Sequence, residues 1–276
     1  MEQLNELIET LSSTDHKIYV NVDKKSDLDI SKINNKANLI KKRINIEWGR
    51  FSQVKATLIS LQEIIKEENK FEHVVFISGQ DFPMRPNEVI DQTLLQGKEY
   101  LRYSLSTEDG WKFAPRYERF HFGNSSLQKN LSSILYRRLM KPLNWKRRYP
   151  KNYTPYAGAQ WWMLTRDCIL YILNFVKTQK RYVQFHGFVN CSDEIFFQTI
   201  VLNSPFSNDV VNNCLHYVDW SESKKSKTGS PNVLGLEDYD KIMASDNLFC
   251  RKIDYPQSRE LVEKIKESIL SSSGSN

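Results

Sequence analysis

The sequence contains no long hydrophobic run. It has no uninterrupted stretch of about 18 apolar residues, the length that a helix needs to cross a bilayer. The opening segment, MEQLNELIETL, has neither the positively charged start nor the apolar core of a secretory signal. We therefore expect a cytoplasmic protein that does not span a membrane.

Cysteine is also sparse. The four cysteines, Cys168, Cys191, Cys214 and Cys250, lie far apart and show none of the paired spacings typical of metal sites. In a cytoplasmic protein such cysteines are expected to be reduced, buried thiols. The pattern therefore predicts no metal site built on cysteine.

Acidic residues are scarce in one segment. The chain carries a formal charge of +6, yet residues 112–151 contain eleven basic residues and a single acid, Glu118. The densest part, YRRLMKPLNWKRRYPK, interleaves aromatic and cationic residues as membrane-interface and nucleic-acid surfaces do, although a solvated loop also fits. We expect this segment to contact an anionic membrane or a pyrophosphate-linked partner, with Arg137, Arg138, Arg147 and Arg148 contacting the membrane, and we expect no nucleic-acid partner.

The overall composition is that of a globular protein. With 276 residues, 40% of them hydrophobic, the chain can bury a large core. We predict a single domain over residues 1–270. The remaining segment 271–276, SSSGSN, is small and polar and is predicted to be an unstructured tail.

Helical and strand patterns alternate along the chain. Apolar residues recur at helical spacing over 4–11 and 54–65, whereas residues 17–22, 43–48 and 73–78 have the character of strands. Farther on, strands are predicted at 99–105 and 158–165, and helices at 167–179 and 193–203. This order predicts an α/β fold with a mostly parallel sheet flanked by helices, which binds ligands at the carboxyl ends of its strands.

A polar turn follows the strand predicted at 73–78. Gly79 lets the backbone turn sharply, and Asp81 can accept hydrogen bonds from a ligand at the edge of the sheet. The same residues also fit a purely structural Asx turn. Asp81 is therefore a candidate site residue with a structural alternative.

Six stretches carry a family resemblance: IYVNVDKKSD, INIEWGRFSQVKATLISLQE, FISGQDFPMRPNEVI, YAGAQWWMLTRDCI, NCSDEIFFQTIV and LFCRKID. In this order and at these separations they resemble the core-2/I-branching β-1,6-N-acetylglucosaminyltransferase family, which includes peptide O-xylosyltransferases. The resemblance implies a GT-A-like Rossmann-type fold. It also implies inverting transfer of a sugar from a UDP-sugar to a glycan or lipid-linked glycan, with N-acetylglucosamine as the favoured donor sugar. It implies no metal and no other cofactor.

The resemblance assigns the catalytic base to Glu194. From the residues alone, Ser192 could cap a helix that begins here, with Asp193 and Glu194 placed favourably in its first turn. A helix N-terminus would also keep Glu194 ionised, as a general base requires.

The resemblance also assigns residues to the two substrates. Fixed cations can neutralise the departing diphosphate in place of a metal. The donor-binding residues that it implies are Asp23, Trp48, Gln53, Lys227, Arg251 and Lys252; Trp48 could alternatively belong to the core. The implied acceptor-binding residues are Asp81, Trp161, Trp162, Tyr217 and Asp219. Trp161 and Trp162 are expected on opposite faces of a strand, one as a sugar platform and one packed inside.

Other interpretations remain open. Asp27 and Asp29 form an Asp-x-Asp motif that could hold a metal in a metal-dependent transferase. The basic segment alone would suit a nucleic-acid-binding protein. Finally, the strand with which family members usually begin is absent ahead of the first predicted helix, and its loss would suit a non-catalytic sugar-binding relative.

Overall fold

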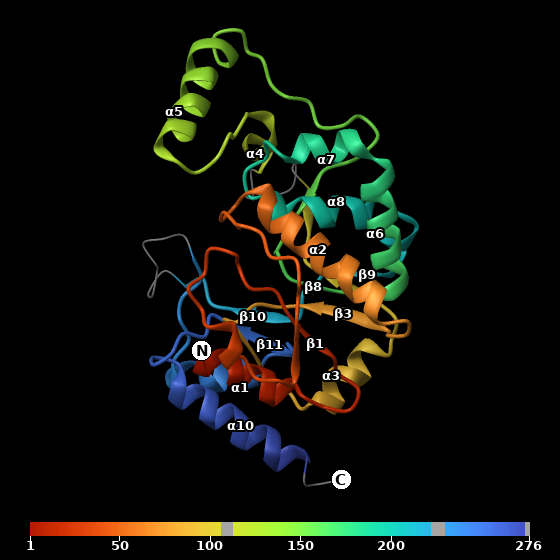
Figure 1. Ribbon diagram of the computed structural model, residues 1–276, viewed down its shortest axis with the longest axis vertical. Helices are drawn as coiled ribbons and strands as arrows, with labels where there is room; N and C mark the ends of the chain where they lie inside the picture. The colour runs from red at the N-terminus through yellow and green to blue at the C-terminus, as the bar shows by residue number, and fades with distance from the viewer. Residues whose placement is uncertain (106–112, 222–229, 274–276) are drawn as a thin grey trace.

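The computed structural model describes residues 1–105, 113–221 and 230–273, and it confirms the predicted α/β class. Figure 1 shows helices on both sides of a set of short strands. The helices are α1 (Glu2–Leu11), α2 (Phe51–Glu67), α3 (Asn87–Leu94), α4 (Ala114–Glu118), α5 (Ser126–Leu135), α6 (Arg166–Thr178), α7 (Lys180–His186), α8 (Phe196–Leu202), α9 (Tyr239–Met243) and α10 (Arg259–Ser273).

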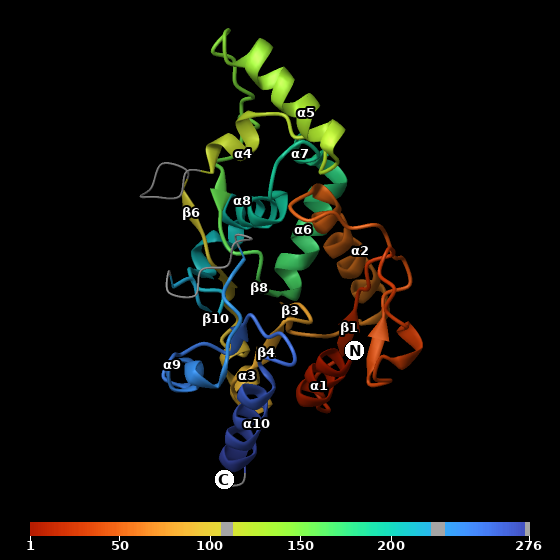
Figure 2. The same cartoon turned by 90° about the vertical axis from the view of Figure 1, so that its left-hand side faces the viewer.

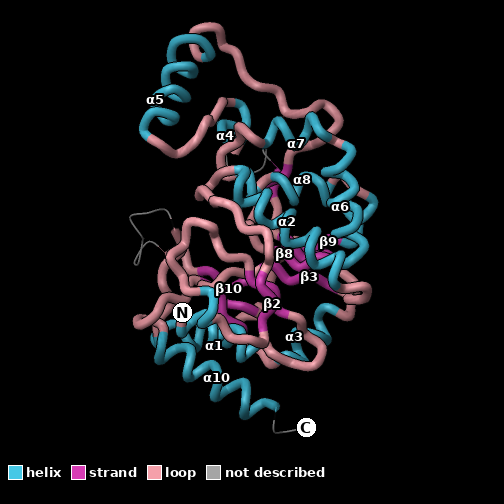
Figure 3. Tube along the Cα trace, viewed as in Figure 1, coloured by secondary structure: helices cyan, strands magenta, loops and turns pink. Residues whose placement is uncertain are grey.

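The strands are short, and Figure 3 shows them gathered in the middle of the molecule. They are β1 (Ile18–Val20), β2 (Ala37–Leu39), β3 (His73–Phe76), β4 (Asp81–Pro83), β5 (Glu99–Leu101), β6 (Ser104–Leu105), β7 (Tyr156–Ala157), β8 (Trp162–Thr165), β9 (Val210–Val211), β10 (His216–Val218) and β11 (Phe249–Arg251).

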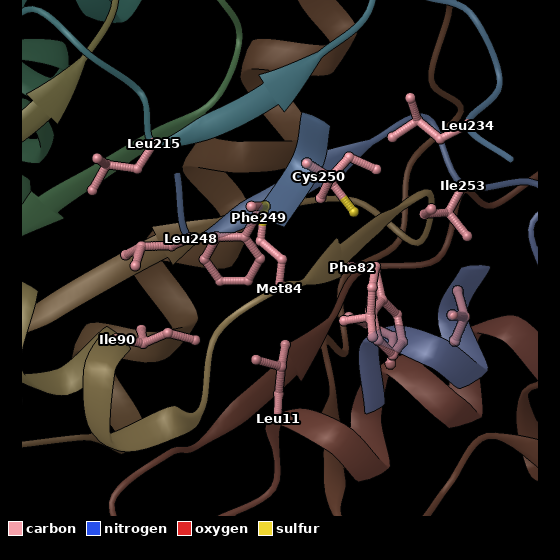
Figure 4. Close-up of a cluster of buried hydrophobic side chains, with 14 of the residues drawn as sticks. Leu11, Phe82, Met84, Ile90, Leu215, Leu234, Leu248, Phe249, Cys250 and Ile253 are labelled. Atoms are coloured by element: carbon pink, nitrogen blue, oxygen red, sulfur yellow. The ribbon is translucent and has the colours of Figure 1, made fainter. Parts of the chain in front are cut away.

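A four-stranded sheet, β3-β8-β5-β9, separates two hydrophobic cores. Successive side chains of a strand point to opposite faces, so Met163 of β8 enters one core while Trp162 and Leu164 enter the other. Helices α2, α6 and α8 close the second core. The first core lies against α1, α10 and the three-stranded sheet β10-β11-β4, whose Phe82, Phe249 and Cys250 are drawn in Figure 4.

The sheets are mixed, which corrects the prediction of a mostly parallel arrangement. Within the described residues β1 and β2, β10 and β11, and β5 and β9 pair in parallel. The pairs of β8 with β3 and β5, of β11 with β4 and of β6 with β7 are antiparallel. Hydrophobic patterning reports which strands are buried but not how they pair, so the sequence could not reveal this.

A gap separates β1 from β3. Both strands line a cavity of about 940 Å³, together with α1, α2 and α3. Within the described residues β1 pairs only with β2, and β3 pairs only with β8, so each presents an unpaired edge to this cavity. The β1-β2 ladder and the sheet that contains β3 are therefore separate sheets in the described part of the chain.

Three local predictions were wrong. Residues 43–48 are extended but pair with no strand in the described chain. The helix expected over 193–203 is split into a 3-10 turn, Ser192–Glu194, and α8. At the other end, α10 continues to Ser273, into the segment expected to be an unstructured tail, while residues 274–276 lie outside the described residues. None of the described helices combines the length and the hydropathy needed to cross a bilayer.

Candidate active site

Glu194 lies at the end of a tight turn. Cys191 adopts a left-handed conformation, with φ of 48°, and the Glu194 amide donates to the Cys191 carbonyl at 3.2 Å. The Glu194 carboxylate is partly exposed and forms an ion pair with the guanidinium of Arg116, which comes from α4. Glu194 is thus held by a charged side chain and remains accessible.

The expected helix cap at Ser192 is not present. Ser192 is buried, and its hydroxyl lies 3.3 Å from Nδ1 of His186 instead of capping a helix. Glu194 belongs to a 3-10 turn and not to the first turn of an α-helix. The positive group that pairs with its carboxylate is the guanidinium of Arg116. Burial would lower the pKa of Arg116, but the charge and hydrogen bond of Glu194 raise it above its usual value.

The neighbouring carboxylate differs sharply from Glu194. Asp193 is buried, and its Oδ1 has no hydrogen-bond partner. Burial, followed by the charge of Glu194, raises the pKa of Asp193 to about 7. Of the two adjacent acids, only Glu194 therefore offers an accessible carboxylate to a substrate.

The turn that contains Trp48 packs directly against the Glu194 turn. The Gly49 carbonyl accepts a hydrogen bond from the Cys191 amide at 2.8 Å, and Gly49 has φ of +66°, where glycine is favoured. The side chain of Gln53 accepts a hydrogen bond from the Gly49 amide. Trp48 itself is 71% exposed. Its ring is therefore not part of the core but stands at the surface near Glu194.

A second cluster is built around Arg251. Its guanidinium donates to Asp81 Oδ1 at 3.0 Å and to Ser78 Oγ at 2.8 Å, and lies 4.6 Å from the ring centroid of Trp161. The Asp81 side chain is completely buried. Its other carboxylate oxygen accepts from the Ser78 amide, three residues earlier, so Asp81 has a structural role although the bond is not that of an Asx turn. Trp161 also stacks on His216.

Removing this buried carboxylate should destabilise the protein. The substitution Asp81→Ala leaves the guanidinium of Arg251 without its partner, and we expect the free energy of unfolding to fall by about 3–5 kcal/mol. Urea unfolding would measure the change. The control is Asp209→Ala, which breaks the exposed pair with Lys98 and should cost about 0–1 kcal/mol. A small loss for Asp81→Ala, accompanied by weaker acceptor binding, would contradict the structural role.

The two clusters are joined by a short segment. The Gly158 amide donates to the Glu194 carbonyl at 2.8 Å, and Trp161 of the second cluster lies three residues further along the chain. Three residues span at most about 11 Å. Gly158 is required here because a Cβ would lie 1.6 Å from the Arg102 carbonyl oxygen. The base candidate and the Arg251 cluster therefore belong to one region of the molecule.

The remaining donor candidates take different positions. The Asp23 carboxylate accepts from the Ile46 amide at 3.2 Å, and it thereby fixes the segment that leads to Trp48. Lys252 follows Arg251 and is partly buried, with its carbonyl accepting from Leu234 at 2.9 Å. Lys227 lies outside the described residues.

The remaining acceptor candidates lie on or near β10 and β8. Tyr217 pairs with Cys250 of β11, and Asp219 receives a hydrogen bond from the Asn232 side chain at 3.0 Å. Tyr217 thus lies on the strand beside Arg251, and Asp219 directly follows that strand. Trp162 is fully buried and stacks on Phe76, so it packs inside as one of the two tryptophans was expected to do. Trp161, expected on the opposite face of the strand, precedes β8 and is also buried.

The Asp-x-Asp motif belongs to an exposed loop. Asp29 caps the short 3-10 turn Ile30–Lys32 by accepting from the Ser31 amide at 3.2 Å. Its other oxygen lies 3.6 Å from the ammonium of Lys32. This carboxylate therefore caps a local turn.

The sequence interpretation missed Arg116. Arg116 and Glu194 are separated by 78 positions, and no local pattern links them. The only available signal was the basic character of residues 112–151, which we attributed to an anionic surface. Arg50 was also missed; its Nε donates to Asn124 at 2.8 Å and thereby anchors the Trp48 turn to the segment after α4.

Comparisons with known proteins extend these observations. Residues 3–243 match the family described as Core-2/I-Branching enzyme. The chain is 23% identical over 226 residues to the beta-glucuronosyltransferase GlcAT14B of Arabidopsis thaliana, covering 79% of this chain and 49% of that protein. It is 22% identical over 286 residues both to xylosyltransferase 2 of Rattus norvegicus and to xylosyltransferase 1 of Homo sapiens, covering 95% of this chain and 32% and 28% of those proteins. The chain thus spans about half or less of the length of these relatives.

Proposed function

This chain belongs to the core-2/I-branching enzyme family and is a glycosyltransferase, and from that premise we propose that it transfers N-acetylglucosamine from UDP-N-acetylglucosamine to a glycan hydroxyl with inversion and without a metal. The observation that carries the proposal is the accessible Glu194 carboxylate held by Arg116. Its acidic neighbour Asp193 is buried, which leaves Glu194 as the group that can meet an acceptor.

In the proposed step Glu194 removes the proton from the acceptor hydroxyl. The freed oxygen attacks the anomeric carbon on the face opposite UDP, a new glycosidic bond forms, and the bond to the diphosphate breaks. The leaving diphosphate gains negative charge, which the ammonium of Lys252 neutralises. Arg251 is already paired with Asp81, so its contribution is to fix the position of the chain next to Lys252.

The donor sugar has two further candidates. The names of the relatives refer to transfer of xylose and of glucuronic acid. The donor that we propose is a UDP-sugar, and N-acetylglucosamine ranks before xylose and glucuronic acid as its sugar. The acceptor that we propose is a glycan or a lipid-linked glycan. Peripheral contact with an anionic membrane is proposed as well, and it does not depend on the donor sugar.

Thermal shift with nucleotide sugars tests this proposal. We expect UDP-N-acetylglucosamine to raise Tm more than UDP-xylose or UDP-glucuronic acid, because a ligand that binds only the folded state stabilises it by mass action. At a hundred times its Kd the ligand adds about 2.7 kcal/mol. Turnover and the shift should be unchanged by EDTA.

Two results would contradict this proposal. A larger shift with another sugar would reassign the donor. Turnover lost in EDTA and restored by Mn²⁺ would overturn the metal-independent mechanism and favour a carboxylate pair such as Asp27 and Asp29. The matched test of that pair is Asp27→Asn with Asp29→Asn, which should leave turnover unchanged under the proposed mechanism.

A further inference from the structure

Residues 119–148 form an arm that projects from the body of the protein. The arm contains α5 and a π-helical turn, Tyr136–Met140, that continues it. Figures 1 and 2 both show α5 standing beyond α4 at the end of the molecule opposite α10. None of the ten residues of α5 is buried. This helix therefore adds little to the core, although a capping box at Ser125 and Gln128 fixes its start.

The arm exposes large apolar side chains. Leu127, Leu131 and Ile134 follow a helical spacing and share one face of α5. Leu127 is 78% exposed, and Leu143, beyond the π-helical turn, is 74% exposed. Trp145 is half-exposed at the end of the arm and stacks on Phe120 at a centroid distance of 6.0 Å. Aromatic and aliphatic side chains in this setting suit the boundary between lipid headgroups and acyl chains.

The same arm is positively charged. Residues 119–148 contain no Asp or Glu, and exposed basic residues accompany the apolar ones. Those exposed cations are Lys129, Arg137, Arg138, Lys141, Lys146 and Arg148. Cations of this kind near a surface that bears anionic lipid each favour binding. Apolar exposure and positive charge together match an anionic membrane more closely than a neutral protein surface.

Arg147 has a different role from the one predicted. It is buried, and its guanidinium donates to the carbonyls of Phe185 at 2.8 Å and of Arg119 and Phe188 at 3.1 and 3.2 Å. It also lies over the ring of Phe120. Arg147 therefore anchors the end of the arm to the body of the protein and is not available to lipid.

Both ends of the arm connect to the Glu194 region. Directly before the arm, α4 carries Arg116, which pairs with Glu194. After its end the chain returns through β7 to Gly158, whose amide donates to the Glu194 carbonyl. The arm is therefore anchored at both ends to the elements that hold the proposed base.

From this placement we infer that the arm docks on an anionic lipid surface and presents the Glu194 site to a glycan carried by a membrane lipid. The docking part stands on the arm alone, whereas the choice of acceptor rests on the proposed glycosyltransferase function. A membrane-anchored acceptor would reach the base without leaving the bilayer surface.

Vesicle flotation tests the docking directly, with no turnover required. The full chain should bind vesicles of phosphatidylcholine containing phosphatidylglycerol, and bind phosphatidylcholine alone more weakly. Reversing two cations in Arg137→Glu with Arg138→Glu should lower the partition coefficient at least about 20-fold. Leu127→Ser with Leu131→Ser should lower it at least about 10-fold, since both side chains lose apolar contact.

Matched controls separate docking from general charge and hydrophobicity. Lys180→Glu with Arg181→Glu changes two exposed cations on α7, and Leu95→Ser changes an apolar side chain that is 72% exposed directly after α3. These controls should bind the anionic vesicles like the wild type. All variants should retain the wild-type Tm and the wild-type shift with UDP.

Three outcomes would overturn docking: no binding of the wild type to anionic vesicles, unchanged binding by both arm variants, or an equal loss in the controls. A single-stranded RNA oligonucleotide bound through Arg137 and Arg138, without vesicle binding, would also overturn it and favour a nucleic-acid partner. Absence of a UDP shift in the wild type, with vesicle binding intact, would instead count against the proposed function alone.

Discussion

Replacing Glu194 by glutamine is expected to slow glycosyl transfer by about 10²–10⁴-fold, the usual contribution of a general base. Glutamine keeps the shape of the side chain but cannot take the proton from the acceptor hydroxyl. The nucleotide sugar should still bind, because in the proposed mechanism Glu194 acts on the acceptor. Single-turnover kinetics would report the rate, and thermal shift with UDP-N-acetylglucosamine would report donor binding.

The adjacent acid provides the control. Asp193 is buried, so Asp193→Asn should retain more than about a tenth of wild-type turnover, outside the range expected for loss of a base. If instead Glu194→Gln keeps more than about a tenth of the rate, Glu194 is not the base. Asp193 would then be the next candidate, since Asp81 is held by Arg251.

Replacing Lys252 by alanine is expected to damage both binding and turnover. In the proposed step its ammonium neutralises the charge that appears on the leaving diphosphate, and loss of such a group costs about 10²–10³-fold in kcat. Arg251 cannot substitute, because its guanidinium is already held by Asp81 and Ser78. Steady-state kinetics would give kcat, and titration with UDP would give Kd.

Two variants make this second test specific. Lys252→Arg keeps the positive charge and should recover a large part of UDP affinity, whereas Lys241→Ala removes an exposed cation from α9 and should change neither constant. Equal UDP affinity in Lys252→Ala and the wild type would contradict a diphosphate contact. Loss of stability in Lys252→Ala, read as a lower Tm, would instead indicate a structural role.

Much of the secondary structure could be predicted because its signal is local. Helices α1, α2 and α6 have apolar faces at regular spacing, and strands β1 and β3 lie within the segments predicted as strands. The turn after β3 was also expected at Gly79. In each case the sequence within a short window is sufficient, since the side chains that define the element are close neighbours along the chain.

The candidate site was only partly predictable because its contacts are distant in sequence. The family resemblance pointed to Glu194, but nothing near it indicates Arg116 as its partner. Likewise, the basic segment could be recognised from composition, whereas the burial of Arg147 and the exposure of Arg137 depend on how the arm folds back. Composition reports the charge of a segment and not which of its side chains reach solvent.

The gap between β1 and β3 has a consequence for how the protein opens. Backbone hydrogen bonds within the described sheets do not run from the β1-β2 ladder to β3, so that ladder can separate without breaking the bonds of β3, β8, β5 and β9. We expect this ladder to form its own cooperative unit, with an opening free energy below that of global unfolding. Asp23, which follows β1, lies in this unit, while Glu194 lies outside it. We therefore expect the donor side and the base side of the proposed site to differ in local stability.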